Sequence, residues 1–285
     1  MRKIKIISLL ILVCFLNQCK QPDDKNTPVK TKILKKRVKP ASEGYHYEKT
    51  KDWAIKKSSE KEQNIVMAVN RTDKKNIAKL DSIIIPNDLG GDVEFYLPFP
   101  ISIPFINDIN KIIFFSYPTQ SFAAYETGEL AYAGQTNMGR KADPTPTGLY
   151  YTNWKAEQTT STVNDEWDLK WNFNIENKLG IGFHQYELPG YPASHSCLRL
   201  TEKDAVFLYN WADEWVLFNQ DSVNAKGTPV IVFGAYPFDG AKPWMELINN
   251  PHALDITKSI IEQQVQPFKS DILLQQQKRS ASAIK

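Results

Sequence analysis

The sequence places one thiol close to two imidazoles. Cys197 follows His195 by two positions and His184 by thirteen, within the stretch from Gly182 to Leu200. The thiolate is the reactive form of cysteine, and a neighbouring imidazole raises its share at neutral pH. This grouping is typical of a cysteine nucleophile with a histidine base. A zinc site is the alternative, but the sequence offers neither the HxxxH nor the CxxC spacing that would support one.

The start of the chain has the features of an export signal. Three positive charges precede the apolar run Ile6–Leu16, which is too short to span a bilayer. Cys14 lies inside that run and Cys19 stands where cleavage is expected, so the segment resembles a bacterial lipoprotein signal. We expect a signal peptide over residues 1–18 and a lipid on Cys19 that anchors the exported protein at the periplasmic face or the cell surface. Because the two residues before Cys19 are bulky, a plain secretory signal is the alternative.

Such processing would leave Cys197 as the one free thiol of the mature protein. The chain has three cysteines, and exported proteins usually pair theirs in disulfides. A lone cysteine in an exported protein is either a buried bystander or a reactive group. The neighbouring histidines favour the reactive group.

Composition excludes one class of partner and predicts a tether. The net charge is +3 over 285 residues, and the basic residues crowd near the N-terminus. The chain therefore lacks a fold-wide basic face, and we expect no nucleic-acid partner. Residues 19–44 are rich in lysine and proline and lack the apolar surface needed to order themselves, so we expect a flexible tether. Attraction of its basic run to anionic head groups or glycans is the alternative to a simple spacer.

Residues 45–89 are expected to form a small module. The apolar runs Ile65–Arg71 and Ile83–Pro86 predict strands, and the polar stretch Lys74–Leu80 between them predicts a helix. The string AVNR…NIAKLDSIIIP resembles the second half of a LysM repeat, a module that binds N-acetylglucosamine-containing glycan. We expect a small α+β LysM-like module that positions the next domain, with glycan binding as the less favoured role.

Residues 108–236 have the pattern of a β domain. Lys111–Ser116 is an apolar run of strand length, and Ser121–Tyr125 and Leu130–Gly134 flank a turn that contains Gly128. Two such runs around a short glycine-containing turn predict a hairpin. Further short strands follow, so the sequence predicts a mainly β fold, an antiparallel β-sandwich or barrel-like domain.

Helices are expected after this β-rich stretch. Thr201 is a suitable N-cap with Asp204 three residues later, and apolar residues then recur at helical spacing. Thr228–Phe233 predicts a closing strand. Residues 237–285 keep a helical period that Pro267 interrupts, and we expect them to form a helical extension that flanks the β domain.

Three blocks of the sequence, in order, resemble the L,D-transpeptidase (YkuD-type) family. The string SHSCLRL, with His184 ahead of it and the spacer PGYPAS between, is similar to the family signature around its nucleophile. The stretch from Gly139 to Tyr150, GRKADPTPTGLY, is similar to a second block of the family. Gln120 to Gly134 resembles the hairpin that opens the family's catalytic domain.

The resemblance implies a role for each matching residue. Cys197 is the implied nucleophile, which attacks the carbonyl between the third residue and D-Ala of a peptidoglycan stem, and His184 is the implied general base. His195 and Ser194 flank the nucleophile, orient the base and line the site. The other implied site residues are Ser196, whose backbone N–H completes an oxyanion hole with that of Cys197, Arg199, which steadies the site, and Tyr191 and Gly190, which contact substrate.

Ser196 departs from the family pattern, which usually has glycine there. If this position requires a positive φ, the side chain carries a penalty of about 1 to 3 kcal/mol. We expect the activity to persist with a narrower fit for substrate.

The reaction that the resemblance implies is acyl transfer from a stem tetrapeptide through a Cys197 thioester, with release of D-Ala and formation of a 3–3 cross-link. No metal or organic cofactor is implied. The implied partners are peptidoglycan stem peptides and glycan, and the membrane through Cys19. Three alternatives stay open: water as acceptor in an L,D-carboxypeptidase, attachment of a protein to the wall, and a catalytically weak cell-wall-binding lipoprotein.

Overall fold

The computed structural model describes residues 36–53, 58–161, 168–220 and 222–282. The chain divides into two units, Met1–Lys36 and Arg37–Lys285, and the fold given below is that of the second unit. The expected signal peptide, Cys14, the lipidated Cys19 and most of the tether lie outside the described residues. No helix in the described ranges combines the length and the apolar character needed to cross a membrane.

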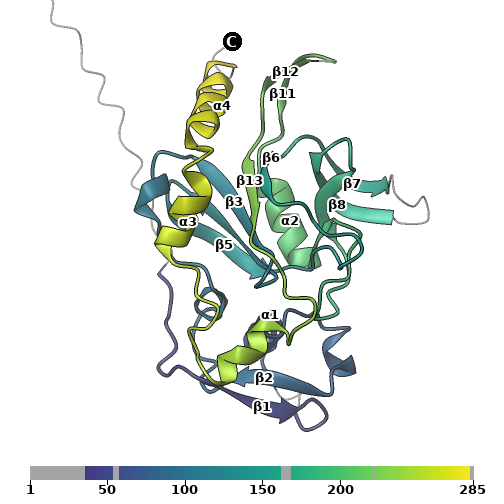
Figure 1. Ribbon diagram of the computed structural model, residues 1–285, viewed down its shortest axis with the longest axis vertical. Coiled ribbons are helices and arrows are strands. Elements are labelled where there is room, and N and C mark those ends of the chain that lie inside the picture. The colour runs from purple at the N-terminus through teal and green to yellow at the C-terminus, as the bar shows by residue number, and fades with distance from the viewer. Residues whose placement is uncertain (1–35, 54–57, 162–167, 221, 283–285) are drawn as a thin grey trace, which may run out of the picture. The chain divides into compact units, whose positions relative to one another are not determined.

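A five-stranded sheet forms one layer of this unit (Figure 1). Its strand order is β5–β4–β3–β13–β6, with the bounds β3 Lys111–Ser116, β4 Ser121–Glu126, β5 Glu129–Gln135, β6 Gly148–Tyr151 and β13 Pro229–Phe233. β4 and β5 form the hairpin that the sequence predicts, and Thr127 and Gly128 take φ angles of 49° and 78° in its turn. Glycine adopts such angles without strain, which fits its place in this tight turn.

A second sheet of four strands carries the residues expected to do chemistry. Its order is β10–β9–β8–β7, with the bounds β7 Lys155–Thr160, β8 Asp168–Glu176, β9 Ile181–Gln185 and β10 Leu198–Leu200. β9 and β10 run parallel, and their register pairs Arg199 with His184. The expectation of purely antiparallel sheets is wrong for this pair and for β3–β13, which is also parallel. Parallel neighbours need long connections, and local alternation does not report on them.

An aromatic core fills the space between the two sheets. Phe115 and Phe122 of the five-stranded sheet stack with their ring centroids 5.5 Å apart, and Phe115 lies 6.2 Å from Phe183 of the other sheet. Phe183 and the adjacent Phe173 are fully buried. This core fixes the position of β9, which carries His184 one residue after Phe183.

Helices flank the sheets, as the sequence predicts. Helix α2 (Glu202–Trp211) packs against the aromatic core and begins at Thr201, whose side chain accepts a hydrogen bond from the N–H of Asp204. The C-terminal helices α3 (Lys258–Val265) and α4 (Lys269–Ser282) cover the other face of the five-stranded sheet. The fold is therefore mainly β with flanking helices, and its sheets do not close into a barrel.

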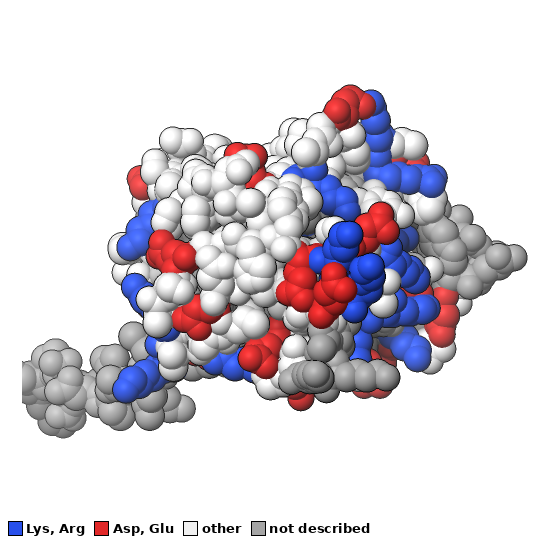
Figure 2. Space-filling model, turned by 90° about the horizontal axis from the view of Figure 1, so that it is seen from below, with Lys and Arg blue, Asp and Glu red and all other residues white. Residues whose placement is uncertain are grey.

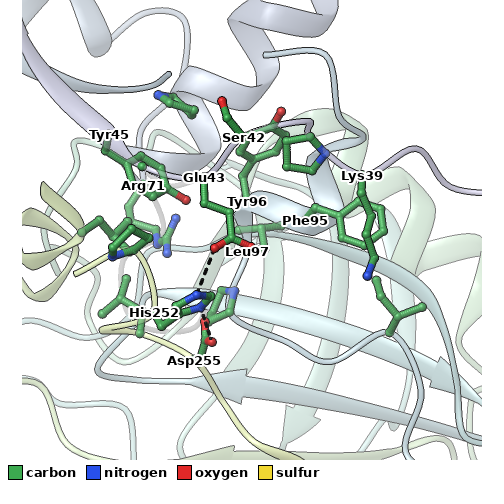
Figure 3. A pocket seen from close by; sticks show the side chains of 18 residues that line it. Lys39, Ser42, Glu43, Tyr45, Arg71, Phe95, Tyr96, Leu97, His252 and Asp255 are labelled. Carbon is green, nitrogen blue, oxygen red and sulfur yellow. Dashed lines mark hydrogen bonds and ion pairs between the residues drawn. The ribbon is translucent and has the colours of Figure 1, made fainter. Parts of the chain in front are cut away.

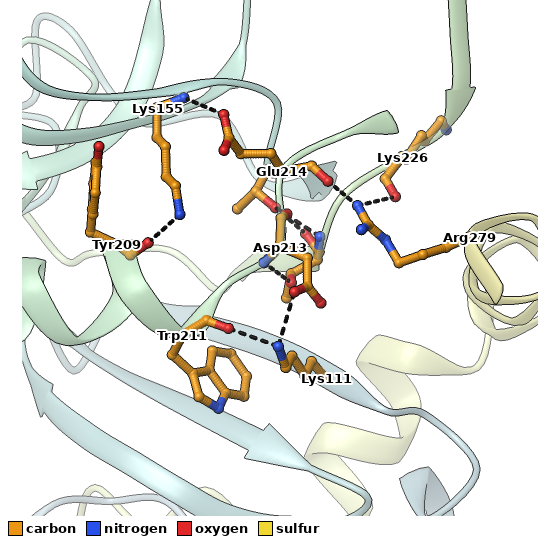
Figure 4. A network of polar contacts seen from close by, with 10 residues as sticks. Lys111, Lys155, Tyr209, Trp211, Asp213, Glu214, Lys226 and Arg279 are labelled. Atoms are coloured by element: carbon orange, nitrogen blue, oxygen red, sulfur yellow. Dashed lines mark hydrogen bonds and ion pairs between the residues drawn. The ribbon is translucent and has the colours of Figure 1, made fainter. Parts of the chain in front are cut away.

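Polar contacts fasten the end of α4 beside the hairpin of β11 (Val216–Asn219) and β12 (Ser222–Ala225), as Figure 4 shows. The Arg279 guanidinium donates to the backbone carbonyls of Glu214 and Lys226. Close by, Lys111 at the start of β3 donates to the Asp213 carboxylate at 3.0 Å. The Arg279 contacts tie the C-terminal extension to the segments that flank this hairpin.

The N-terminal module consists of two antiparallel strands with a helix between them. Its elements are β1 Tyr45–Lys49, α1 Glu60–Val69, the 3-10 helix η2 Ile77–Lys79 and β2 Ser82–Pro86. The expectation of a strand over Ile65–Arg71 is wrong, because most of that segment belongs to α1. A capping box between Ser59 and Glu62 starts the helix, and the buried Ile65 and Val69 lie one turn apart on it.

The module packs directly on the segment that follows β9. Thr72 donates through its hydroxyl to the Leu188 carbonyl at 2.9 Å, and the Leu188 N–H donates to the Asp73 carboxylate at 2.5 Å. Seen from the side of β1 and β2, a broad uncharged area lies beside a cluster in which Lys and Arg alternate with Asp and Glu (Figure 2). Whether the module is of the LysM type stays a prediction.

Candidate active site

Cys197 lies directly before β10 and opens into a small pocket. The lining residues are Ser161, Leu169, His184, Tyr186, Ser194, His195, Cys197 and Arg199. The parallel pairing of β9 with β10 brings His184 beside Arg199, two residues beyond the thiol. Five of the site residues named from the sequence thus share one pocket.

His184 is held as a neutral base. Its side chain is 4% exposed, and its Nδ1 lies 3.0 Å from the Gln185 carbonyl, an acceptor, so that Nδ1 carries the proton and Nε2 has a lone pair. Burial lowers the His184 pKa to about 4, the hydrogen bond to Gln185 raises it, and the Arg199 charge lowers it further. Above that pH the imidazole can accept a proton at Nε2.

The Cys197 thiol is protonated in the same conditions. Burial raises its pKa, while a hydrogen bond with the Gly182 backbone and the Arg199 charge act in the opposite direction. The thiol also donates weakly to the Gly180 carbonyl at 3.8 Å. A neutral imidazole beside a neutral thiol suits general-base catalysis, in which the proton moves as the sulfur attacks.

Ser196 has the positive φ that its glycine-like position suggested. Its φ is 76°, and its hydroxyl donates to the carbonyls of Asp143 and Pro144 at 3.3 and 3.2 Å. The Thr145 hydroxyl donates to the Ser196 carbonyl at 2.8 Å. Because a trans peptide directs its C=O and N–H to opposite sides, this bond turns the Cys197 N–H away from Thr145. That is the orientation an oxyanion-hole donor next to the thiol needs.

The upstream GRKADPTPTG segment supports the loop around Cys197. The Gly139 N–H donates to the Thr145 hydroxyl at 2.9 Å, and a side chain at Gly139 would place its Cβ 2.2 Å from the Asp143 carbonyl. Ser194 donates from its hydroxyl to the Cys197 carbonyl at 2.5 Å. The two blocks named from the sequence therefore meet in space and hold the backbone on both sides of the thiol.

Asn137 is a supporting residue that sequence reasoning missed. Its amide donates to the Tyr191 carbonyl and accepts from the Ala193 N–H at 3.2 Å, so one side chain clamps the spacer before the nucleophile. The backbone of Asn137 also exchanges hydrogen bonds with Arg199 at 3.0 and 2.9 Å. No local pattern marks this asparagine, since its partners lie more than 50 positions away in the chain.

Asp143 and Tyr186 were also missed, and both bear on the charged side chains of the site. The Asp143 carboxylate lies 2.6 Å from Nε of Arg140 and 3.9 Å from Nε2 of His195. The Arg199 guanidinium lies over the Tyr186 ring, 4.4 Å from its centroid. An anionic side chain beside His195 and an aromatic platform beneath Arg199 position both groups at the pocket.

Tyr191 and Gly190 lie outside this pocket. Tyr191 is 52% exposed, and Gly190 is buried with a φ of 81°, where an added Cβ would lie 3.4 Å from the Asn70 carbonyl of the N-terminal module. Their expected contact with substrate stays a prediction. In the described part of the chain, no three His, Cys, Asp or Glu side chains lie close enough together to hold a metal ion.

Comparison with known families gives a match for the segment that holds this pocket. The YkuD model, described as the L,D-transpeptidase catalytic domain, matches residues 110–232. This segment is therefore similar to an L,D-transpeptidase catalytic domain. The match includes both expected blocks and the hairpin, so the resemblance is confirmed for this part of the chain.

Solved L,D-transpeptidases share similarity over less than half of the chain. The enzyme of Stackebrandtia nassauensis is 22% identical with a TM-score of 0.38, over 45% of this chain and 58% of that one. The enzyme of Mycobacterium smegmatis is 18% identical with a TM-score of 0.35, over 44% and 59%. The chain thus spans less than two thirds of their length. No curated protein matches it.

Proposed function

We propose that the chain is a peptidoglycan L,D-transpeptidase that works through a thioester on Cys197. The observation that carries the proposal is that this thiol and His184, a buried imidazole kept neutral with its Nε2 lone pair available, line one pocket inside the matched segment. A thiol with a raised pKa needs such a base to become a nucleophile.

In the proposed first step, the Cys197 sulfur attacks the carbonyl that joins the third stem residue to D-Ala while Nε2 of His184 takes the thiol proton. The N–H groups of Ser196 and Cys197 stabilise the oxyanion. The intermediate collapses, the C–N bond breaks, and His184 returns the proton to the leaving amine of D-Ala. In the second step an amine of a neighbouring stem attacks the thioester, which forms a 3–3 cross-link and regenerates the thiol.

A groove beside the pocket supports an amine acceptor over water. It has a volume of about 710 Å³ and shares Tyr186 with the Cys197 pocket. Gln185, Glu187 and Lys75 of the N-terminal module line the groove, and Lys75 forms an ion pair with Glu187. These groups can bind a peptide backbone and its charges. An acceptor stem fits a groove of this size, whereas hydrolysis needs no such surface.

The proposal includes the place of work. We propose that the protein is exported and held in a membrane through lipid on Cys19, and that the LysM-like module orients the catalytic domain toward glycan. The contacts of Thr72 and Asp73 with Leu188 support the orienting role of the module, because they fix it beside the segment that follows His184.

The test is acylation of the full-length protein by a carbapenem, followed by intact-protein mass spectrometry. The expected result is one adduct per chain on Cys197 and none on Cys197→Ala, with both proteins folded by circular dichroism. Absence of an adduct on folded, reduced protein would favour the catalytically weak wall-binding alternative.

A second incubation with a disaccharide tetrapeptide separates the reaction types. A cross-linked dimer with release of D-Ala supports transpeptidation. Release of D-Ala without a dimer would instead assign an L,D-carboxypeptidase, and neither product would contradict the proposed function.

A further inference from the structure

A second cavity lies between the N-terminal module and the segment before α3. Its volume is about 250 Å³, and it shares no residue with the Cys197 pocket. Its walls come from segments far apart in the chain, as Figure 3 shows: Lys39 to Tyr45, Arg71, Pro86, Phe95 to Ile101 and Leu247 to Asp255. The proposed reaction does not use this cavity, although Arg71 and Pro86 belong to the LysM-like string of the sequence.

Arg71 is the one cation of this cavity that is deeply buried. Its side chain is 1% exposed, its φ is 55°, and it lies beside Trp244 with 5.9 Å between guanidinium and ring. Nε donates to the Thr119 carbonyl at 2.5 Å, and Nη1 donates to the carbonyls of Ala68 and Val69. Three backbone carbonyls thus fix the orientation of the guanidinium.

The remaining nitrogen of Arg71 lacks a partner. Nη2 is buried and makes no hydrogen bond within the described part of the chain, where no carboxylate approaches the guanidinium within 4.0 Å either. Burial lowers the pKa of Arg71 to about 10, so the group is still charged at neutral pH. A buried charge without a counter-ion is costly, and an anion held in the cavity beside the guanidinium would lower that cost.

The rim of the cavity carries charges of both signs. His252 lies between two carboxylates, 3.1 Å from Glu43 and 2.9 Å from Asp255. The hydrogen bond with Asp255 raises the His252 pKa. Lys39 also lines the cavity, so the rim is close to neutral when His252 is protonated, and either carboxylate can attract an ammonium group. Between rim and floor, Phe95, Leu97 and other apolar side chains line the walls.

We propose that this cavity binds a small molecule with a single carboxylate, an apolar body and the size of an amino acid or dipeptide. The carboxylate acts as the counter-ion of the Arg71 guanidinium, the apolar body packs on the aromatic and aliphatic walls, and an ammonium group faces Glu43 and Asp255. The inference is independent of the proposed function, since it rests on no residue of the Cys197 pocket.

The test is a ligand-observed NMR titration of the full-length protein with three probes: alanyl-alanine, its C-terminal amide and inorganic phosphate. We expect alanyl-alanine to bind and the amide to bind at least about tenfold more weakly, because the amide lacks the negative charge that pairs with Arg71. Phosphate should bind more weakly than alanyl-alanine.

Two variants locate the binding. Arg71→Gln removes the charge and should abolish binding, but it also disturbs backbone contacts, so its fold must be checked by thermal melting. Ser42→Trp fills the cavity from its exposed rim without touching Arg71, and Ser42→Ala is its matched control. Ser42→Trp should lose binding of alanyl-alanine while Ser42→Ala keeps it.

Three results would overturn the proposal. They are equal affinity for the acid and the amide, undiminished binding to folded Ser42→Trp, and no binding of alanyl-alanine to the folded parent protein. Tighter binding of phosphate than of alanyl-alanine would overturn the assignment of a single carboxylate.

Discussion

The Cys197 pocket and the Arg71 cavity are built in opposite ways. In the pocket, the polar groups that shape the backbone have partners: Thr145 holds the Ser196 carbonyl, Ser194 holds the Cys197 carbonyl, and His184 is tied to Gln185. In the cavity, Nη2 of Arg71 makes no hydrogen bond with any residue that the structure describes. The difference teaches that paired backbone groups go with precise placement of nearby side chains, whereas a buried charge that lacks a counter-ion marks a place that a ligand can complete.

One turn of the chain supports both places. Thr119, between β3 and β4, accepts from Arg71, and the next residue, Gln120, accepts at its side chain from the Met138 N–H at 2.8 Å. The Met138 carbonyl in turn accepts from the Ser194 N–H at 3.1 Å. Arg71 and Ser194 are therefore linked by three hydrogen bonds and one peptide unit, through the turn between β3 and β4 and through Met138.

The largest expected effect tests the pocket side of the comparison. His184→Ala removes the base and should slow acylation of Cys197 by a carbapenem about 10² to 10⁴-fold, because the thiol is protonated at neutral pH. The measurement is the acylation rate, from samples quenched at successive times and analysed by intact-protein mass spectrometry. A rate within a few fold of the parent protein would mean that the thiolate forms without His184.

The two arginines allow a direct comparison of the two sites. Arg71→Met should destabilise the fold by about 2 kcal/mol, because it leaves backbone carbonyls unsatisfied even though it removes a buried charge. Arg199→Met loses mainly its contact with the Tyr186 face, so it should cost less than about 1 kcal/mol of stability. Its main effect should be slower acylation of Cys197 by the acyl donor.

Urea unfolding and the acylation rate, measured on both arginine variants, check this pair. If Arg199→Met were the less stable protein, Arg199 would contribute more than Arg71 to the stability of the fold. The assignment of a structural role to Arg71 and a functional role to Arg199 would then be wrong.

The next prediction concerns preorganisation of the nucleophile loop. Thr145→Val keeps the shape of the side chain but removes the bonds to the Ser196 carbonyl and from the Gly139 N–H. Acylation should slow about 10 to 100-fold, equivalent to about 1.4 to 2.7 kcal/mol, the range for an unmet buried partner. The matched control is Thr147→Val in the same segment, at an exposed position, which should leave the rate unchanged. Equal effects of the two variants would remove the role given to Thr145.

Sequence reasoning reached the pocket because its chemistry is local in the chain. Cys197, His195 and His184 fall within fourteen positions, and the β4–β5 hairpin and the cap at Thr201 are set by neighbouring residues. Strand and turn propensity act over such distances, so these features were predictable.

The rest depended on contacts that local patterns do not report. The strand predicted at Ile65–Arg71 is helical because the capping box at Ser59 and burial on several sides outweigh its β-branched content. The parallel pairing of β9 with β10, the clamp made by Asn137 and the cavity at Arg71 join segments far apart in the chain. Neither hydrophobic periodicity nor residue spacing in the sequence predicts these features.

A smaller effect is expected at Ser196, where the backbone beside the pocket is strained. Ser196→Gly removes the strain of a positive φ, because glycine adopts that angle freely, and should stabilise the fold by about 1 kcal/mol. Loss of the long hydroxyl hydrogen bonds to Asp143 and Pro144 should reduce this gain slightly. Ser196→Ala keeps the strain and loses only those bonds, so it should be slightly less stable than the parent protein. Urea midpoints measure both. Equal stabilisation by Gly and Ala would place the effect in the hydroxyl and not in the backbone.

The smallest expected effect is a flat pH profile. With a His184 pKa of about 4, the base is mostly neutral at pH 5 and remains so at pH 7, so the acylation rate should change less than about twofold across that range. The raised Cys197 pKa adds no inflection there, because the thiol stays protonated throughout. A histidine with its ordinary pKa near 6.5 would instead lose roughly thirtyfold at pH 5. Such a loss, in protein shown by circular dichroism to be folded, would mean that solvent reaches His184 and that the pocket is less closed to water than its contacts imply.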